Sequence, residues 1–238
     1  STYRRAARVI AGSMYTLSAL PHDVRRYAVY IPENGIDPSV FNAKDRLPVS
    51  QVEPFRILFV GRLVPYKGAD MVLQAVGSSP RLRRAAEVVL VGAGPEERRL
   101  RQMASSLGIA DHTRFMGSLP QQQVAAICRR SSVMAFPSLR EFGGAVVIEA
   151  MACGLPCIVI NHGGPAEHVT DQTGVRLPLG TRQAMIAAMQ AALEDLCARR
   201  DRLAAMSVAG IERVQSQYIW ARKAEQMQRI YWEVVGNG

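Results

Sequence analysis

The sequence of 238 residues has no apolar run near the roughly 20 residues that a membrane-spanning helix needs. No apolar stretch of signal-peptide type follows Ser1-Thr-Tyr-Arg-Arg5, so no signal peptide is expected. The four cysteines show neither the density of a disulfide-stapled domain nor the spacing of a zinc site. These absences predict a cytoplasmic protein with reduced thiols.

Lysine is also rare, with only Lys44, Lys67 and Lys223, so arginine supplies most of the formal net charge of +9. The arginines form short groups spread along the chain. Two interpretations stay open: solvated helix faces, or a surface that meets an anionic acceptor or the anionic inner face of a membrane, where the protein would be peripheral. No basic stripe carries interleaved aromatic residues, so nucleic acid is not an expected partner.

Strands and helices alternate along the middle of the chain. Apolar runs predict strands at residues 55–60, 87–91, 113–116, 133–136, 156–160 and 174–177. Helices are expected at residues 69–76, 96–107, 121–130 and 145–152. Continuous apolar strands joined by helices predict an α/β fold, with a doubly wound, mostly parallel sheet covered by helices on both faces. Such sheets bind ligands beyond the carboxyl ends of their strands, where the glycine turns of this sequence fall.

The two ends of the chain differ from its middle. Residues 1–32 are expected to hold two short strands, at 8–11 and 27–31, and the chain is expected to be helical from Arg182 onward. Helical spacing near the end is kept by Ile219, Lys223, Met227, Ile230 and Val234. This spacing favours a helix packed on a neighbouring domain, with an amphipathic membrane-surface helix as the alternative.

A glycine turn between a strand and a helix carries the first candidate site. Gly143 and Gly144 let the backbone approach a ligand, and the helix expected from Ala145 supplies free N–H groups that suit a phosphate. Glu141, before the turn, and Glu149, one turn into the helix, face the same space. Two acceptor groups beside an anion site suit a ligand with hydroxyls on both sides of a phosphate, such as a nucleotide sugar.

Two cations are expected at the same sheet edge. Arg62 and Lys67 follow the strand at 55–60, and Lys67 opens the next helix. A cation at a helix N-terminus is unfavourable unless an anion joins it. Two such cations can neutralise a diphosphate leaving group in place of a metal. Each charge alone would be an ordinary solvated side chain, but their gathering at one edge favours a site.

The segment Pro137-Ser-Leu-Arg-Glu-Phe-Gly-Gly-Ala-Val-Val-Ile-Glu-Ala-Met-Ala-Cys-Gly-Leu-Pro156 closely resembles the glutamate-x7-glutamate signature of family 4 glycosyltransferases, retaining enzymes of the GT-B fold. Four further segments resemble the same family in the same order. They are Ile31-Pro-Glu-Asn-Gly-Ile-Asp37 with Phe41, Phe59-Val-Gly-Arg-Leu63 with Lys67-Gly68, Val89-Leu-Val-Gly-Ala-Gly-Pro95, and Phe115-Met-Gly-Ser-Leu119. The resemblance covers nearly the whole chain. In one departure, Phe142 follows Glu141 directly, where many members have an intervening residue.

The resemblance implies a role for each site residue. Arg62 and Lys67 would hold the diphosphate, Glu141 would contact the transferred sugar and Glu149 would bind the ribose, which makes Arg62, Lys67 and Glu141 the expected catalytic residues. The other expected donor-binding residues are Leu119 and Gln121 at the base, and Phe142, Gly143, Gly144, Ala145 and Val146 along the sugar and phosphate. Family members usually transfer a hexose with retention and without a metal. A donor phosphate oxygen is thought to deprotonate the acceptor, so neither a protein base nor a further cofactor is expected.

The resemblance also implies a division of the chain. Residues 1–32 would be the end of an acceptor-binding N-terminal domain with its linker, 33–216 the nucleotide-sugar-binding domain, and 217–238 a helix that packs back on the N-terminal domain. That N-terminal domain would bind the acceptor, which is a sugar, a lipid-linked glycan or a small molecule. The isolated chain is expected to bind a UDP-, GDP- or ADP-linked sugar weakly and to transfer no sugar alone.

Other functions fit the sequence less well than that of a glycosyltransferase. A non-catalytic nucleotide-binding module would not need the complete set of Arg62, Lys67, Glu141 and Glu149. A nucleotide-sugar epimerase of the same fold would show a different catalytic set, and a phosphorylase would need a lysine for pyridoxal phosphate. The turn Gly92-Ala-Gly94 lacks the third glycine of a dinucleotide fingerprint, so it is expected to be structural. His112, His162 and His168 have no metal-site spacing, and no metal is expected.

Overall fold

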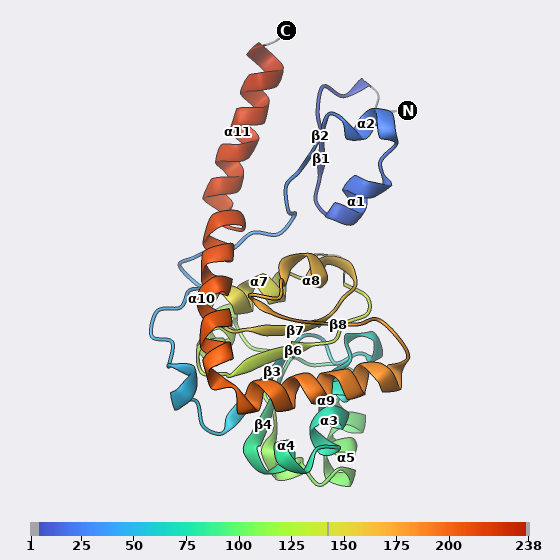
Figure 1. The fold of residues 1–238 in the computed structure, drawn as a ribbon, viewed down its shortest axis with the longest axis vertical. Helices are drawn as coiled ribbons and strands as arrows, with labels where there is room; N and C mark the ends of the chain where they lie inside the picture. The colour runs from blue at the N-terminus through green and yellow to red at the C-terminus, as the bar shows by residue number, and fades with distance from the viewer. Residues whose placement is uncertain (1–4, 142, 237–238) are drawn as a thin grey trace.

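A six-stranded parallel sheet forms the body of the chain in a computed structural model that describes residues 5–141 and 143–236 (Figure 1). The strands lie side by side in the order β5-β4-β3-β6-β7-β8. Their bounds are β3 (Phe55–Val60), β4 (Ala86–Val91), β5 (Thr113–Phe115), β6 (Val133–Phe136), β7 (Cys157–Ile160) and β8 (Gly174–Leu177). All six predicted strands are confirmed to within a residue at each end. Every residue of β4, β6 and β7 is buried, which explains why these strands are apolar without alternation.

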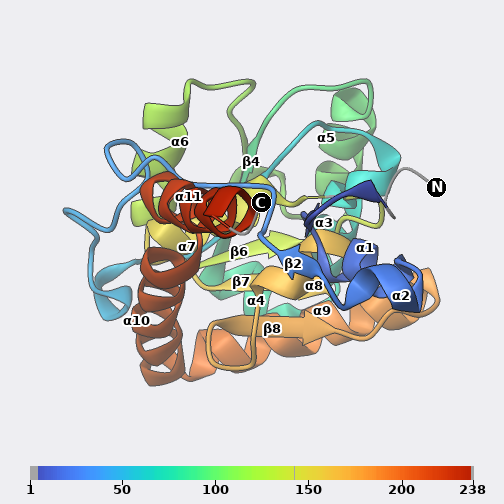
Figure 2. The ribbon, with the colours of Figure 1, turned by 90° about the horizontal axis from the view of Figure 1, so that it is seen from above.

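Helices cover both faces of this sheet, so the doubly wound α/β fold is confirmed (Figure 2). The helices that alternate with the strands are α3 (Ala69–Gly77), α4 (Pro80–Ala85), α5 (Glu97–Ser106), α6 (Gln121–Arg129), α7 (Ala145–Ala152) and α8 (Gly163–His168). Helix α3 packs against α5 and α9 (Arg182–Ala198), whereas α7 packs against α6 and α10 (Arg200–Gln217). Short 3₁₀ turns lie at η2 (Val49–Gln51), η3 (Pro65–Lys67) and η4 (Ala110–His112).

Two of these helices were not predicted. Helix α4 begins after Ser79, whose hydroxyl accepts a hydrogen bond from Leu82 N, with Pro80 in the first turn. This Ser-Pro start signal is present in the sequence, but the helix is too short to show periodicity. Helix α8 begins in Gly163-Gly-Pro165, residues that usually mark a turn, so no sequence signal favoured it.

The direction of chain winding reverses between β3 and β6. From β3 the chain adds β4 and then β5 on one side, and afterwards β6, β7 and β8 on the other. Loops that leave the carboxyl ends of the two central strands therefore diverge to opposite faces of the sheet and open a crevice between them.

The N-terminal residues form a separate small unit. A parallel pair of strands, β1 (Val9–Ala11) and β2 (Ala28–Tyr30), lies with α1 (Met14–Ala19) and α2 (His22–Arg25) outside the main sheet (Figure 1). The last helix, α11 (Trp220–Gly236), extends from the body of the chain alongside this unit (Figure 1). The two predicted N-terminal strands are confirmed, and so is the helical C-terminal part as far as residue 236, with breaks at residues 199 and 218–219. Within the described ranges, no helix is both long and apolar enough to cross a membrane.

Candidate functional site

Loops that follow β3, β6 and β7 meet at the reversal point of the sheet. The backbone N–H of Leu139, after β6, donates a hydrogen bond of 2.9 Å to the carbonyl of Tyr66, after β3. On the other side, a Cβ added to Gly163, after β7, would lie 2.7 Å from the carbonyl oxygen of Glu141. The loop after β6, which carries the predicted glutamate, is therefore held between its two neighbours.

Lys67 and Glu141 form an ion pair across this point. Their side chains are 16% and 20% exposed, so the pair is partly withdrawn from water, and the Lys67 ammonium lies 5.3 Å from the centroid of the Phe136 ring. The prediction that Lys67 is the first residue of the next helix is wrong, because helix α3 begins at Ala69. Lys67 closes the 3₁₀ turn η3, because Gly68 follows with a φ of 75° and separates the two helical segments.

Asp70 fixes the start of helix α3 beside Lys67. Its buried carboxylate lies 3.1 Å from the Arg99 guanidinium of α5 and is also paired with Arg182, the first residue of α9. This anchor could not be predicted from the sequence, since the two arginine partners of Asp70 lie 29 and 112 residues away along the chain. The anchor ties the segment that carries Lys67 to two neighbouring helices.

Arg62 lies in the loop directly after β3 and is exposed. The neighbouring loop after β4 fixes this segment, because Leu63 N donates to the carbonyl of Ala93 at 3.0 Å. A Cβ on Gly92 would overlap the carbonyl oxygen of Gly61, and one on Gly94 would overlap the backbone of Leu63. The glycines of this turn thus let two backbones touch, which confirms the structural role predicted for them.

Glu149 lies one turn into α7 and is half-buried. Burial raises the pKa of its carboxyl group above the ordinary value. Among the described residues, nothing donates a hydrogen bond to its side chain or forms an ion pair with it. A desolvated carboxylate without donors is suited to accept hydrogen bonds from ligand hydroxyls.

Gly144 is the N-cap residue of α7 and has a φ of 64°, a conformation that favours glycine. A Cβ on Gly143 would overlap the side-chain tips of Glu33 and Asn34, which belong to the linker after β2. This approach of the linker to the glycine turn was not predicted. Ala145 and Val146 form the first turn of α7 and are half-buried, while the predicted Phe142 lies outside the described residues.

The two residues predicted at the base lie at the same sheet edge, farther from the reversal point. Gly92 N donates to Gly117 O at 2.7 Å, which joins the ends of β4 and β5. Beyond this bridge, Leu119 is half-buried against the core and Gln121 is exposed as the first residue of α6.

His168 is a residue whose contact with the site was not predicted. It ends α8, is buried, and lies with Nε2 2.6 Å from the carbonyl oxygen of Gly143 and with Nδ1 3.1 Å from the Tyr218 hydroxyl. Over the residues described, no group of three or more His, Cys, Asp or Glu side chains is arranged to hold a metal ion. The cysteines Cys128, Cys153, Cys157 and Cys197 are free thiols.

Comparison with known proteins places this arrangement in a family. The model of "Glycosyl transferases group 1" matches residues 42–207, more than half of the chain. A GDP-mannose-dependent alpha-(1-6)-phosphatidylinositol monomannoside mannosyltransferase of Mycolicibacterium smegmatis is 34% identical over 181 residues, which cover 72% of this chain and 46% of the relative. A D-inositol 3-phosphate glycosyltransferase of Geodermatophilus obscurus is 34% identical over 224 residues, which cover 88% of this chain and 48% of the relative. The chain thus spans about half the length of the curated relatives it matches.

Solved structures share the fold. Sucrose-phosphate synthase from Thermosynechococcus elongatus superposes with a TM-score of 0.78 at 27% identity, over 98% of this chain and 60% of the other. The C-terminal domain of a glycosyl transferase group 1 protein from Francisella tularensis superposes with a TM-score of 0.67 at 21% identity, over 78% of this chain and 100% of the other. These neighbours are GT-B glycosyltransferases. The chain belongs to the group 1 glycosyl transferases.

Proposed function

We propose that the chain is the donor half of a retaining hexosyltransferase that binds a nucleotide-diphosphate sugar. The observation that carries this proposal is the Lys67–Glu141 ion pair at the reversal point of the sheet, next to the N-terminus of α7. At this point the cation and the free helix N–H groups suit the diphosphate of such a ligand, and the carboxylates of Glu141 and Glu149 suit the hydroxyls of its sugar and ribose.

Each site residue has a proposed role in the bound state. Arg62 and Lys67 neutralise the diphosphate, and their two positive charges act in place of a metal as it leaves. The backbone from Gly143 to Val146 lines the sugar and phosphate. Glu141 accepts from the sugar hydroxyls and Glu149 from the ribose, while Leu119 and Gln121 flank the base.

The acceptor is proposed to bind outside residues 33–216. Residues 1–32 would belong to an acceptor-binding domain, and residues 217–238 would pack on that domain. The relatives named above act on a phosphatidylinositol mannoside or an inositol phosphate, which supports a sugar, lipid-linked or small polar acceptor. We also propose that the whole protein acts in the cytoplasm, where its arginine-rich surface can meet the anionic inner face of a membrane.

Calorimetry of the chain with UDP, GDP, ADP and their sugars tests the donor assignment. We expect one diphosphate to bind in the presence of EDTA, and Lys67→Met to weaken this binding. Lys44→Met, which removes an exposed lysine, is the control and should leave binding unchanged. The absence of binding to any diphosphate, or equal effects of the two variants, would contradict the proposal.

Product analysis with the full-length protein tests the reaction. Transfer of a hexose with its anomeric configuration retained is the expected result. A full-length protein that binds the donor but transfers nothing would instead be a nucleotide-binding module, and a changed free nucleotide sugar would indicate an epimerase.

A further inference from the structure

His168 contacts both the glycine turn of the donor site and Tyr218, which lies between helices α10 and α11. Its Nε2 atom lies 2.6 Å from the carbonyl oxygen of Gly143, and its Nδ1 atom lies 3.1 Å from the hydroxyl oxygen of Tyr218. The two rings also meet edge to face, with centroids 5.1 Å apart and an interplanar angle of 86°. Both polar atoms of the imidazole thus have one defined partner.

These partners define which ring nitrogen carries the proton. A carbonyl oxygen only accepts, so Nε2 of His168 donates to Gly143. In the neutral ring Nδ1 is then an acceptor, and the Tyr218 hydroxyl donates a hydrogen bond to it. Burial of the imidazole lowers the pKa of His168, which keeps this neutral form in place.

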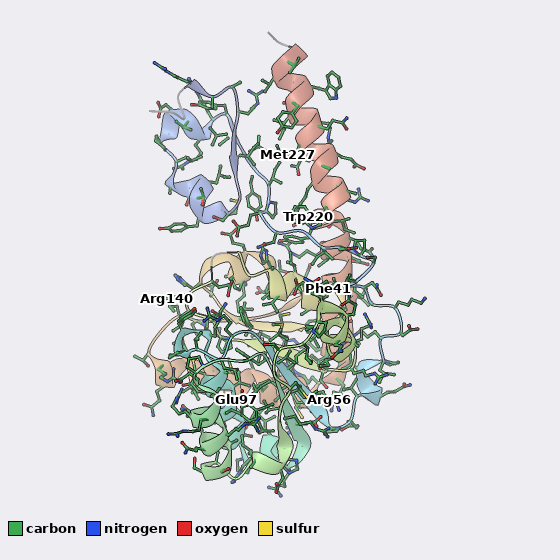
Figure 3. All side chains as sticks on the ribbon, turned by 180° about the vertical axis from the view of Figure 1, so that it is seen from behind. Phe41, Arg56, Glu97, Arg140, Trp220 and Met227 are labelled. Carbon is green, nitrogen blue, oxygen red and sulfur yellow. The ribbon has the colours of Figure 1, made fainter. Side chains whose placement is uncertain are left out.

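The position of His168 is itself fixed from two other elements. Arg213 of α10 donates from Nε to the backbone carbonyl of His168 at 2.8 Å. The carbonyl of Tyr218 accepts from the backbone N–H of Ile36 at 2.7 Å, so the tyrosine is tied to the linker. A Cβ on Gly35 would overlap the ring of Trp220, which lies between the body of the chain and the N-terminal unit (Figure 3). The imidazole is therefore held next to the place where the linker after β2 contacts the segment from Tyr218 to Trp220.

The bond to Gly143 determines the direction of the following peptide N–H. In a trans peptide the C=O and N–H groups point to opposite sides. Because His168 holds the carbonyl of Gly143, the N–H of Gly144 points away from the imidazole. Among the described residues this N–H donates to nothing, and Gly144 is the N-cap of α7, where free donors gather.

We propose that His168 is a positioning residue of the donor site, which holds the Gly143–Gly144 peptide with its N–H directed at the diphosphate. This inference rests on the proposed function. Tyr218 serves the same end indirectly, because its hydroxyl donates to Nδ1 and so stabilises the tautomer that donates to Gly143.

Binding of UDP, GDP and ADP is compared with binding of uridine, guanosine and adenosine to separate positioning from general loss of structure. His168→Phe fills the space but cannot donate to Gly143. We expect it to weaken diphosphate binding about 10-fold, the effect of losing one hydrogen bond to a charged group, while nucleoside binding changes less than about twofold. His168→Gln, with a donor near the place of Nε2, should restore most of the affinity.

The outcomes distinguish this inference from the proposed function. If wild type binds none of UDP, GDP and ADP, both are overturned. If wild type binds but His168→Phe loses nothing, or loses nucleoside and diphosphate affinity equally, only the positioning role is overturned. Nitrogen NMR of the wild-type imidazole needs no variant: the proton is expected on Nε2, and a proton on Nδ1 overturns the inference.

Discussion

The ammonium group of Lys67 is ion-paired with the carboxylate of Glu141 across the boundary between β3 and β6. The two side chains come from opposite halves of the sheet, whose winding reverses between these strands. In the free chain each residue neutralises the other, while exposed Arg62 stands nearby in the same loop as Lys67. A diphosphate that binds here would take Lys67 away from Glu141 and release that carboxylate to the sugar.

Lys67→Met and Glu141→Gln should therefore change binding in different ways. Lys67→Met removes a phosphate partner and is expected to weaken both nucleoside diphosphate and nucleotide sugar by about 10- to 100-fold. Glu141→Gln removes a competitor for Lys67, so the free diphosphate should bind as tightly as before or more tightly, while the full-length enzyme loses turnover. Calorimetry at fixed salt measures the first effect and product formation the second. Equal weakening of diphosphate binding by both variants would mean that Glu141 only orients Lys67.

Gly144→Ala tests the helix start at which the phosphate is proposed to bind. Gly144 has a φ of 64°, and a Cβ there would lie 3.0 Å from the Pro165 ring. Gly108→Ala is the matched control, since Gly108 has a φ of 67° but nothing within 4 Å of the added atom. Urea unfolding should show a loss of about 1 kcal/mol for Gly108→Ala from backbone strain alone, and about 2 kcal/mol or more for Gly144→Ala. Only Gly144→Ala should also weaken diphosphate binding. If both variants lose the same unfolding free energy, the contact with Pro165 does not contribute to the loss.

Glu149→Gln should stabilise the free chain at neutral pH while it weakens donor binding. Burial raises the pKa of Glu149, so the folded chain binds a proton more readily than the unfolded chain. The free energy of unfolding therefore falls as pH rises through the folded pKa, and glutamine removes this loss. Urea unfolding at pH 5 and pH 7 should show the variant gaining on wild type at the higher pH, with exposed Glu212→Gln as the control. Nucleoside binding should weaken as well, because the proposed partner is the ribose; unchanged affinity would refute that assignment.

The sequence predicted the fold better than the contacts within the site. Strands such as β6 and β7 are continuously apolar because both faces are covered, and that pattern is local. The sheet edge that gathers Arg62, Lys67, Glu141 and Glu149 follows from strand order alone. Pairings between distant segments leave no local pattern, so the contacts of Asp70 with Arg182, or of His168 with Gly143, could not be predicted.

The burial of Lys223, in helix α11, also depends on a distant segment and could not be predicted from the sequence. Lys223 keeps the predicted helical spacing, and its residue is only 4% exposed, with the ammonium donating to the carbonyl of Pro32 in the linker. The ammonium also lies 5.5 Å from the Trp220 ring and 5.9 Å from the Tyr218 ring. The contact between helix α11 and the linker thus involves the Lys223 ammonium, which has no carboxylate in direct contact among the described residues.

The free energy of unfolding should therefore increase with pH on the alkaline side, because Lys223 is buried. Burial lowers the pKa of Lys223 from 10.5 to about 8 in the folded chain. Between these values the unfolded chain binds the proton and the folded chain does not, so the free energy of unfolding increases with pH, by up to about 3 kcal/mol at the upper limit. Urea unfolding from pH 7.5 to pH 10 should show wild type gaining on Lys223→Met across this window. Lys44→Met, at an exposed site, should keep the slope of wild type. If the unfolding free energies of wild type and Lys223→Met instead change in parallel up to pH 10, the folded chain keeps the proton on Lys223, and burial of this ammonium costs little.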